Sequence, residues 1–165
     1  MISRLVLVSA AALVLAGCRG REITSLQRKE AASVESEAAF AVELHDWKRA
    51  EGLYAKAADL CPDTGETWVN LALVRMHLGD RPGARAAYQT ALSAYEAQSD
   101  SAPADSKAVL RRAYVLVILG RADEARAAVE KARAKHPDDR RLRSFAESHG
   151  VDGMIADPGL KEISP

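Results

Sequence analysis

The sequence predicts an all-α fold in which three helical hairpins stack side by side and a terminal helix caps the stack. Two observations support this prediction. Aromatic residues make up only 5% of the 165 residues, while Ala, Leu, Arg and Glu are frequent, a composition that favours helices over sheets. Small residues also recur at equivalent positions in three segments of 34 residues each. A regular recurrence of this kind is typical of an array built from one repeated helical unit.

The three segments are residues 31–64, 65–98 and 106–139, and they align with one another without gaps. Their shared positions hold an alanine, a leucine or a larger apolar side chain. Taken position by position, the residues are Ala38, Ala72 and Ala113; Ala50, Ala84 and Ala125; Ala57, Ala91 and Ala132; Leu44, Leu78 and Leu119; and Tyr54, Tyr88 and Val129. Because alanine lets two helices approach closely, each segment predicts a pair of packed helices.

This pattern resembles the tetratricopeptide repeat, a 34-residue helix–turn–helix unit. The second segment carries the resemblance most fully, through Trp68, Leu71, Ala72, Gly79, Ala84, Tyr88 and Ala91. The resemblance implies a right-handed α-solenoid of three tetratricopeptide repeats plus a C-terminal capping helix. One departure is His45, which stands where the other two segments have Gly79 and Gly120. That turn must therefore hold a positive φ at some cost or adopt a different cap.

The helix boundaries follow from the same alignment. We expect helices near residues 31–44, 47–60, 66–78, 82–98, 105–119 and 122–135, and a capping helix at 139–149. Seven extra residues separate the second and third segments, and we predict that they lengthen the preceding helix to about Ser99. A loop is the alternative, because residues 98–101 are poor helix formers. The repeat domain then covers 31–149, with its cap at 140–149, and residues 150–165 are expected to form a loosely ordered tail.

The first residues have the features of a bacterial export signal. Arg4 precedes a twelve-residue apolar run, Leu5–Ala16, which is too short to span a bilayer as a helix. The next residues complete Leu15-Ala16-Gly17-Cys18, which resembles the bacterial lipobox. The alternative is an ordinary signal peptide cut near Ala16, with Cys18 incidental.

The lipobox resemblance implies a lipoprotein signal peptide at residues 1–17 and a lipidated tether at residues 18–30. Cys18 would carry a diacylglycerol group and an acyl chain, and no other cofactor is expected. Arg19 stands where aspartate often signals retention at the inner membrane, so the outer membrane, facing the periplasm, is the expected location. Cys61 is then a single thiol, and we expect it to be unreactive.

Catalysis and metal binding have little support in the sequence. The four histidines occupy unrelated repeat positions, and the chain lacks HExxH, CxxC and glycine-rich phosphate motifs. No two His or Cys residues are four positions apart on one helix face, as a metal site would need. The formal net charge is zero, so no overall field attracts nucleic acid. We therefore expect a protein that is not an enzyme and that binds neither metal nor nucleic acid.

The inner face of the array is the candidate binding site. The resemblance implies that certain positions of each unit's first helix face inward, and we expect partner contacts at Val69, Asn70, Leu73, Met76, His77, Lys107, Leu110, Arg111, Tyr114 and Val117. This face changes from small and acidic side chains in the first segment to large apolar ones in the third. An exposed apolar strip suits an amphipathic helix or an extended peptide.

Two other interpretations of this face remain open. The C-terminal tail, through Ile155, Leu160 or Ile163, could cover the apolar strip. Alternatively, Asn70, Lys107 and Arg111 match three of the five positions with which some tetratricopeptide proteins grip a C-terminal carboxylate.

Taken together, these features predict a membrane-anchored lipoprotein that acts as a protein-interaction scaffold in the bacterial cell envelope. Lipoproteins that it resembles assist the assembly of pili, secretion systems or outer-membrane machinery. The alternatives are a periplasmic, chaperone-like binder of unfolded or secreted chains and an accessory subunit of a cell-wall enzyme. Three units are about the minimum for a stable stack, so the sequence leaves the oligomeric state open.

Overall fold

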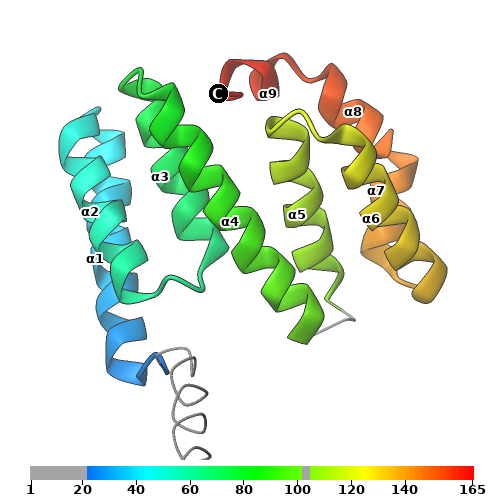
Figure 1. The fold of residues 1–165 in the computed structure, drawn as a ribbon, viewed down its shortest axis with the longest axis horizontal. Helices are drawn as coiled ribbons and strands as arrows, with labels where there is room; N and C mark the ends of the chain where they lie inside the picture. Colours follow the sequence, from blue (N-terminus) through cyan, green and yellow to red (C-terminus); the bar gives the residue numbers. More distant parts are fainter. Residues whose placement is uncertain (1–21, 102–104) are drawn as a thin grey trace, which may run out of the picture.

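A computed structural model describes residues 22–101 and 105–165, and these residues form helices and no strands (Figure 1). The helices are α1 (Ser25–Glu43), α2 (Trp47–Leu60), α3 (Gly65–His77), α4 (Arg81–Ser101), α5 (Ser106–Ile118), α6 (Ala122–Lys135), α7 (Arg140–Glu147), α8 (Gly150–Ala156) and α9 (Pro158–Glu162). The pairs α1–α2, α3–α4 and α5–α6 are helical hairpins, and each hairpin packs on the next through α2–α3 and α4–α5. The predicted all-α solenoid of three units is therefore confirmed.

Alanines line the contacts between the helices. All nine alanines of the three shared positions are buried, and eight of them are completely inaccessible. Larger side chains, among them Leu71, Tyr88 and Leu116, fill the remaining space and are at most 1% exposed. The short alanine side chains allow the backbones to approach, and the larger residues then fill the space at the density of a protein interior.

The turn between the two helices of each hairpin has the same backbone conformation in all three units. Gly79 and Gly120 have φ values of 78° and 76°, and His45, at the equivalent position, has a φ of 57°. The His45 amide donates to the Val42 carbonyl oxygen at 2.9 Å, just as the Gly120 amide donates to that of Val117. The histidine thus holds the positive φ that the sequence offered as one of two possibilities.

Replacing His45 by glycine is expected to raise the free energy of unfolding by about 0.5–1 kcal/mol, because a side chain at positive φ costs about 1–2 kcal/mol per residue and glycine returns part of this as chain entropy. Urea denaturation would measure the change, with Gly79→Ala as the opposite control, expected to lose stability. A loss of stability in His45→Gly would mean that the edge contact of His45 with Trp47, at 5.5 Å between ring centroids, outweighs the strain.

Two helices are longer than the aligned units. α1 begins at Ser25, six residues before the first unit, because Thr24 caps it: the Gln27 amide donates to Thr24 Oγ1 at 3.2 Å, and the Thr24 amide donates to Gln27 Oε1 at 3.0 Å. The C-terminal part of the expected tether is therefore helical. α4 continues to Ser101, which confirms the longer helix over the loop. The expected signal segment and Cys18 lie outside the described residues.

The C-terminal tail differs from the expectation of a loosely ordered segment. Residues 150–165 form α8 and α9, and Val151 and Leu160 are buried in the main core cluster. A cap fixes the start of α9: Asp157 accepts from the Gly159 amide at 2.8 Å, and Pro158 occupies the first turn of the helix. The capping helix α7 also ends earlier than expected, because His149 adopts a positive φ of 73°.

The remaining sequence expectations on this part of the chain concern Cys61 and membrane spans. Cys61 is a free thiol that is only 3% exposed, and burial raises its pKa, as expected of an unreactive cysteine. Within the described residues, no helix has the length and apolar character needed to cross a membrane.

Candidate functional site

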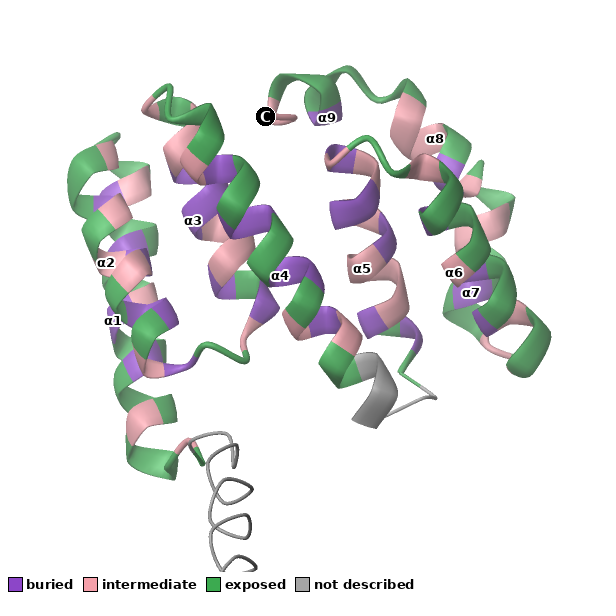
Figure 2. Ribbon diagram, viewed as in Figure 1, coloured by how far each residue is buried: buried purple, intermediate pink, exposed green. Residues whose placement is uncertain are grey.

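The residues expected to contact a partner lie on α3 and α5, the first helices of the second and third hairpins (Figure 2). Most are partly accessible rather than fully buried. The half-buried residues are Val69, Asn70, Leu73, Met76, Leu110, Arg111, Tyr114 and Val117, and the exposed ones are His77 and Lys107. The structure does not gather them into one site. Three of them line a pocket at the first two hairpins, and Tyr114 lies near the C-terminal tail.

The pocket lies between the first and second hairpins and has a volume of about 170 Å³. Three of the expected residues line it, Asn70, Leu73 and His77. The others are Val42, Trp47, Tyr54 and Val74. The lining is mainly apolar, and its groups that can both donate and accept a hydrogen bond are the Asn70 amide, the Tyr54 phenol and the His77 imidazole. Such a surface can take an apolar side chain and fix one neighbouring polar group.

An aromatic stack forms one wall of this pocket. The Trp47 and His77 rings lie parallel, 7° apart in plane, with their centroids at 4.0 Å. His77 comes from the end of α3, and Trp47 begins α2, so the stack joins the two hairpins. Sequence reasoning identified His77 but missed Trp47. Trp47 directly follows the first turn, which places it beside the inward-facing end of the neighbouring helix. That position is the signal that could have identified it.

A polar contact joins the first two hairpins near Tyr54, one of the residues that line the pocket. The fully buried Thr67 hydroxyl donates to the Glu35 carboxylate, which connects α3 to α1. Burial raises the pKa of the Tyr54 phenol, and the nearby Glu35 charge adds to this effect. Tyr54 therefore stays neutral and contributes an apolar ring to the pocket floor at physiological pH.

The three residues expected for a carboxylate clamp are not arranged as one unit. Arg111 forms an ion pair with Glu66 on α3, at 2.6 Å between Nη2 and Oε2. Asn70 lines the pocket at the first two hairpins, while Lys107 is exposed at the start of α5. A peptide carboxylate would have to displace Glu66 before it could pair with Arg111. The next residue, Arg112, pairs with Glu96 of α4 at 2.9 Å.

The C-terminal tail packs against the third hairpin. α8 contacts both α5 and α6, and Ile155 and Ile163 lie partly buried against the core cluster that contains Leu160. Asp157 lies close enough to the Tyr114 phenol to raise its pKa, although burial of the ring has the larger effect. The tail then reaches back to the second hairpin, where Arg85 donates to the Pro165 carbonyl oxygen at 2.5 Å. Ile155, Leu160 and Ile163, the tail residues that the sequence suggested could cover the apolar strip, are thus the ones that pack against the core.

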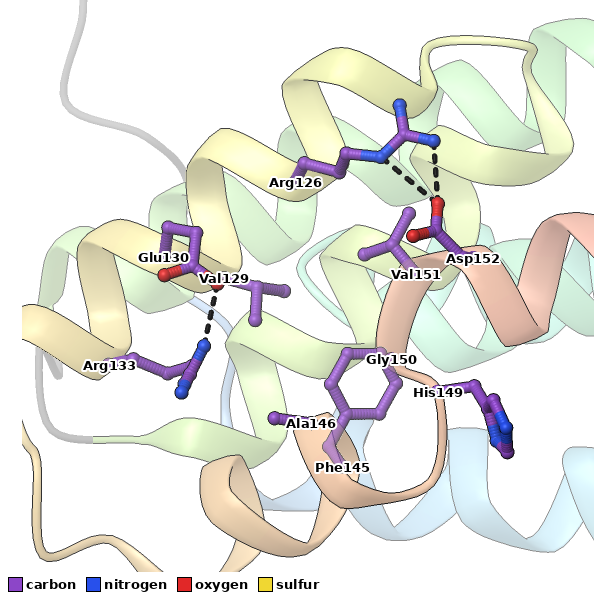
Figure 3. Close-up of a pocket in the computed structure, with 10 residues that line it drawn as sticks. All are labelled: Arg126, Val129, Glu130, Arg133, Phe145, Ala146, His149, Gly150, Val151 and Asp152. Atoms are coloured by element: carbon purple, nitrogen blue, oxygen red, sulfur yellow. Dashed lines mark hydrogen bonds and ion pairs between the residues drawn. The ribbon is translucent and has the colours of Figure 1, made fainter.

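A second cavity, of about 240 Å³, lies between α6, α7 and α8 (Figure 3). Its two guanidinium groups already have acidic partners: Arg126 pairs with Asp152, and Arg133 pairs with Glu130, each at 2.7 Å. The Phe145 ring and Val151 supply the apolar part of the lining. Because both cations are neutralised within the cavity, it has no free positive charge to attract an anion.

Within the described ranges, no group of three or more His, Cys, Asp or Glu side chains is arranged to hold a metal ion. His45 and His77 both contact Trp47, whereas His136 and His149 belong to the C-terminal part of the array. The potential ligands of the described part are therefore dispersed or engaged in aromatic contacts.

The solved structures to which this chain is similar include three TPR domains. The Arabidopsis OM64 TPR domain is 19% identical, with a TM-score of 0.43, and the match covers 73% of this chain and 94% of that one. The first TPR of Spaghetti (RPAP3), bound to the HSP90 peptide SRMEEVD, is 16% identical, with a TM-score of 0.47 and coverage of 79% and 98%. The yeast Sti1 TPR2B-domain:pHsp70 complex is 19% identical, with a TM-score of 0.46 and coverage of 79% and 94%.

The family comparison rests on the sequence. No curated protein shows significant similarity to the chain. A family model described as "Tetratricopeptide repeat" matches residues 37–99 and 69–140, which together span more than half of the chain. These residues include the alanine positions and the turns described above. The chain belongs to the tetratricopeptide repeat family, whose domains mediate protein–protein interaction.

Proposed function

We propose that this protein is a bacterial lipoprotein that is anchored through Cys18 and binds a segment of a partner protein in the groove of its first two repeats. The main support for groove binding is the mainly apolar pocket that has the Trp47–His77 stack as one wall. The chain also belongs to a family of protein-interaction domains. The lipobox-like residues at Cys18 support the anchor. The protein acts as a scaffold in the cell envelope, with assembly of surface or secretion machinery as the process.

The size and chemistry of the pocket favour a protein segment over a small metabolite. Small-molecule sites usually enclose roughly 300–1,000 Å³, whereas this pocket encloses about 170 Å³. A single apolar side chain of the partner would enter between Trp47 and Leu73. The Asn70 amide would then bind the backbone of the partner beside that side chain, which an extended peptide or a helix end can offer.

The inner face is more accessible to a partner at the second repeat than at the third, because the C-terminal tail packs against the third. Tyr114 is close to Asp157, and Leu160 is buried in the core cluster. A partner can therefore reach the pocket at Trp47 and His77 without displacing the tail. This differs from the sequence interpretation, which favoured the apolar side chains of the third segment.

Replacing Cys18 by alanine is expected to abolish acyl labelling and release the protein from the membrane fraction, because two or more acyl chains are what makes membrane association stable. Metabolic labelling with a clickable fatty acid, followed by fractionation, would measure both effects. Cys61→Ala is the matched control and should keep its label and its location. A Cys18→Ala protein that stays in the membrane fraction would contradict the anchor.

Binding in the groove can be tested with full-length protein solubilised from membranes. Asn70→Leu and His77→Ala alter the pocket, whereas His136→Ala changes a half-buried histidine far from it. A partner of fixed stoichiometry should be captured by wild type and His136→Ala and reduced at least tenfold by the two pocket variants. Equal capture by all four proteins would remove the groove as the site. Capture of many unrelated unfolded chains would instead indicate a chaperone-like binder.

A further inference from the structure

The first helix carries the large apolar side chains that remain exposed. Among the described residues these are Leu26, Phe40 and Leu44, which are 74%, 55% and 59% exposed. Leu26 and Phe40 lie in α1, and Leu44 is its C-cap residue. Apolar side chains scattered singly over a surface need no explanation, but these three belong to one helix.

The three side chains also lie on one face. At about 100° per residue, five residues fall within about 30° of a single line along the helix. We call this face the outer stripe, and its residues are Leu26, Ser33, Glu37, Phe40 and Leu44. It is distinct from the face buried against the rest of the array, which consists of Ala31, Val34, Ala38 and Ala41.

The repeat alignment shows what this face does in the other two units. Thr67 and Ala108 are equivalent to Ser33, and Val74 and Val115 are equivalent to Phe40. These four residues are 0%, 3%, 2% and 0% exposed, respectively. In those units the first helix packs against the second helix of the preceding hairpin, through the α2–α3 and α4–α5 contacts. The outer stripe is therefore a repeat-stacking surface that no described helix covers.

We propose that the outer stripe binds the outer stripe of a second copy of this chain, with the two α1 helices antiparallel. The stripe is self-complementary in this arrangement. Leu26 and Leu44 each lie nine residues from position 35, so a two-fold axis at that position brings Leu26 of one copy against Leu44 of the other. The small side chain near the centre of the stripe, Ser33, allows the two helices to approach closely. An interface of this kind closes into a dimer and does not propagate.

Charged side chains on the outer stripe and beside it favour a second copy of the chain as the partner. Among the described residues, Lys29 and Glu37 form no ion pair, in contrast to Glu30, which pairs with Lys56 at 3.4 Å. The antiparallel pair places Lys29 of each copy about one helical turn from Glu37 of the other, so two equivalent ion pairs can form. Insertion of the stripe into lipid would instead bury Glu37, which lies near its middle, without a partner.

Cross-linking in native membranes tests the orientation. In the full-length chain, Ser36→Cys should cross-link to itself, and a mixture of Leu26→Cys and Leu44→Cys chains with different tags should give the mixed product. Leu26→Cys alone should not cross-link, because the two sites would be about 27 Å apart along the helix pair. The chain without an introduced cysteine controls for Cys18 and Cys61. A product from Leu26→Cys alone would indicate parallel helices and overturn the proposal.

Mass measurement in detergent tests the interface itself. Sedimentation of the full-length wild-type protein should give a dimer, and Phe40→Glu combined with Leu44→Glu should give a folded monomer. Ala39→Glu, at an exposed residue on another face of α1, is the matched control and should stay dimeric. Lys29→Glu and Glu37→Lys should each weaken the dimer, and the double variant should restore it. A monomeric wild type would overturn the proposal. So would a Leu44→Cys chain whose label is quenched by brominated lipid and that gives no cross-link, because the stripe would then lie in lipid.

Discussion

Replacing Tyr88 by alanine is expected to lower the free energy of unfolding by about 3–5 kcal/mol, the usual cost of emptying a buried aromatic site. Tyr88 is 0% exposed and belongs to the cluster that joins all three hairpins. The surrounding alanines are too short to fill the space that the ring leaves. In a nearest-neighbour array, a cavity in the middle hairpin weakens its contacts with both neighbours. Urea denaturation followed by circular dichroism would measure the loss.

The conservative variant Tyr88→Phe separates the ring from its hydroxyl group. The Tyr88 hydroxyl oxygen is buried and has no hydrogen-bond partner. Removing a buried polar group that lacks a partner should leave the stability unchanged or raise it by about 1 kcal/mol, because its desolvation is no longer uncompensated. A loss in Tyr88→Phe as large as that in Tyr88→Ala would show that the hydroxyl, and not the volume of the ring, is what the core requires.

Alkaline pH is expected to unfold the array well before its arginine ion pairs are affected. Burial raises the pKa of Tyr95 from its ordinary value near 10 to about 12, and it raises the pKa of Tyr88 further in the same direction. The folded protein therefore keeps protons that the unfolded chain releases above pH 10. Each such tyrosine lowers the free energy of unfolding by about 1.4 kcal/mol per pH unit in this range. For Tyr95 the decline should level off near pH 12.

Urea midpoints at pH 9, 10, 11 and 12 would measure this decline. Below pH 9 the tyrosines should not make the stability change with pH, because they are protonated in both states. Tyr95→Phe should reduce the slope between pH 10 and 12, because phenylalanine has no proton to release in this range. Deprotonation of lysine is a competing cause, but Lys56–Glu30 is an exposed pair and the other ion pairs of the described residues use arginine. Equal slopes for wild type and Tyr95→Phe would contradict the role of Tyr95.

The two large predictions depend on the same structural property. The alanine positions bring the helices close together, so the few large side chains between them are buried almost completely, including Tyr88 and Tyr95. A core made of many small residues and few large ones depends strongly on each large one. The same close packing raises the tyrosine pKa values, because it removes the phenols from water.

Local features were readable from the sequence because they depend on spacing along the chain. The 34-residue period places the hairpins, since each hairpin contacts only its neighbours and each alanine position serves the same contact in every unit. The alignment left two conformations open for the turn at His45, and the structure has the one that matches Gly79. The extension of α4 was also predictable, since the inserted residues follow a helix that can continue.

The site depended on contacts between residues that are distant in sequence. Trp47 becomes a pocket wall only when stacking of the hairpins brings His77 to it, and Arg111 is neutralised only because Glu66 lies across from it on α3. The tail has too few apolar residues to order by itself, and it becomes helical because Val151 and Leu160 find a surface on the third hairpin. Spacing along the chain therefore determines which helices form and in what order they stack. The packing of those helices decides which side chains meet at the groove and which part of it stays open, because these contacts exist only once the hairpins are assembled.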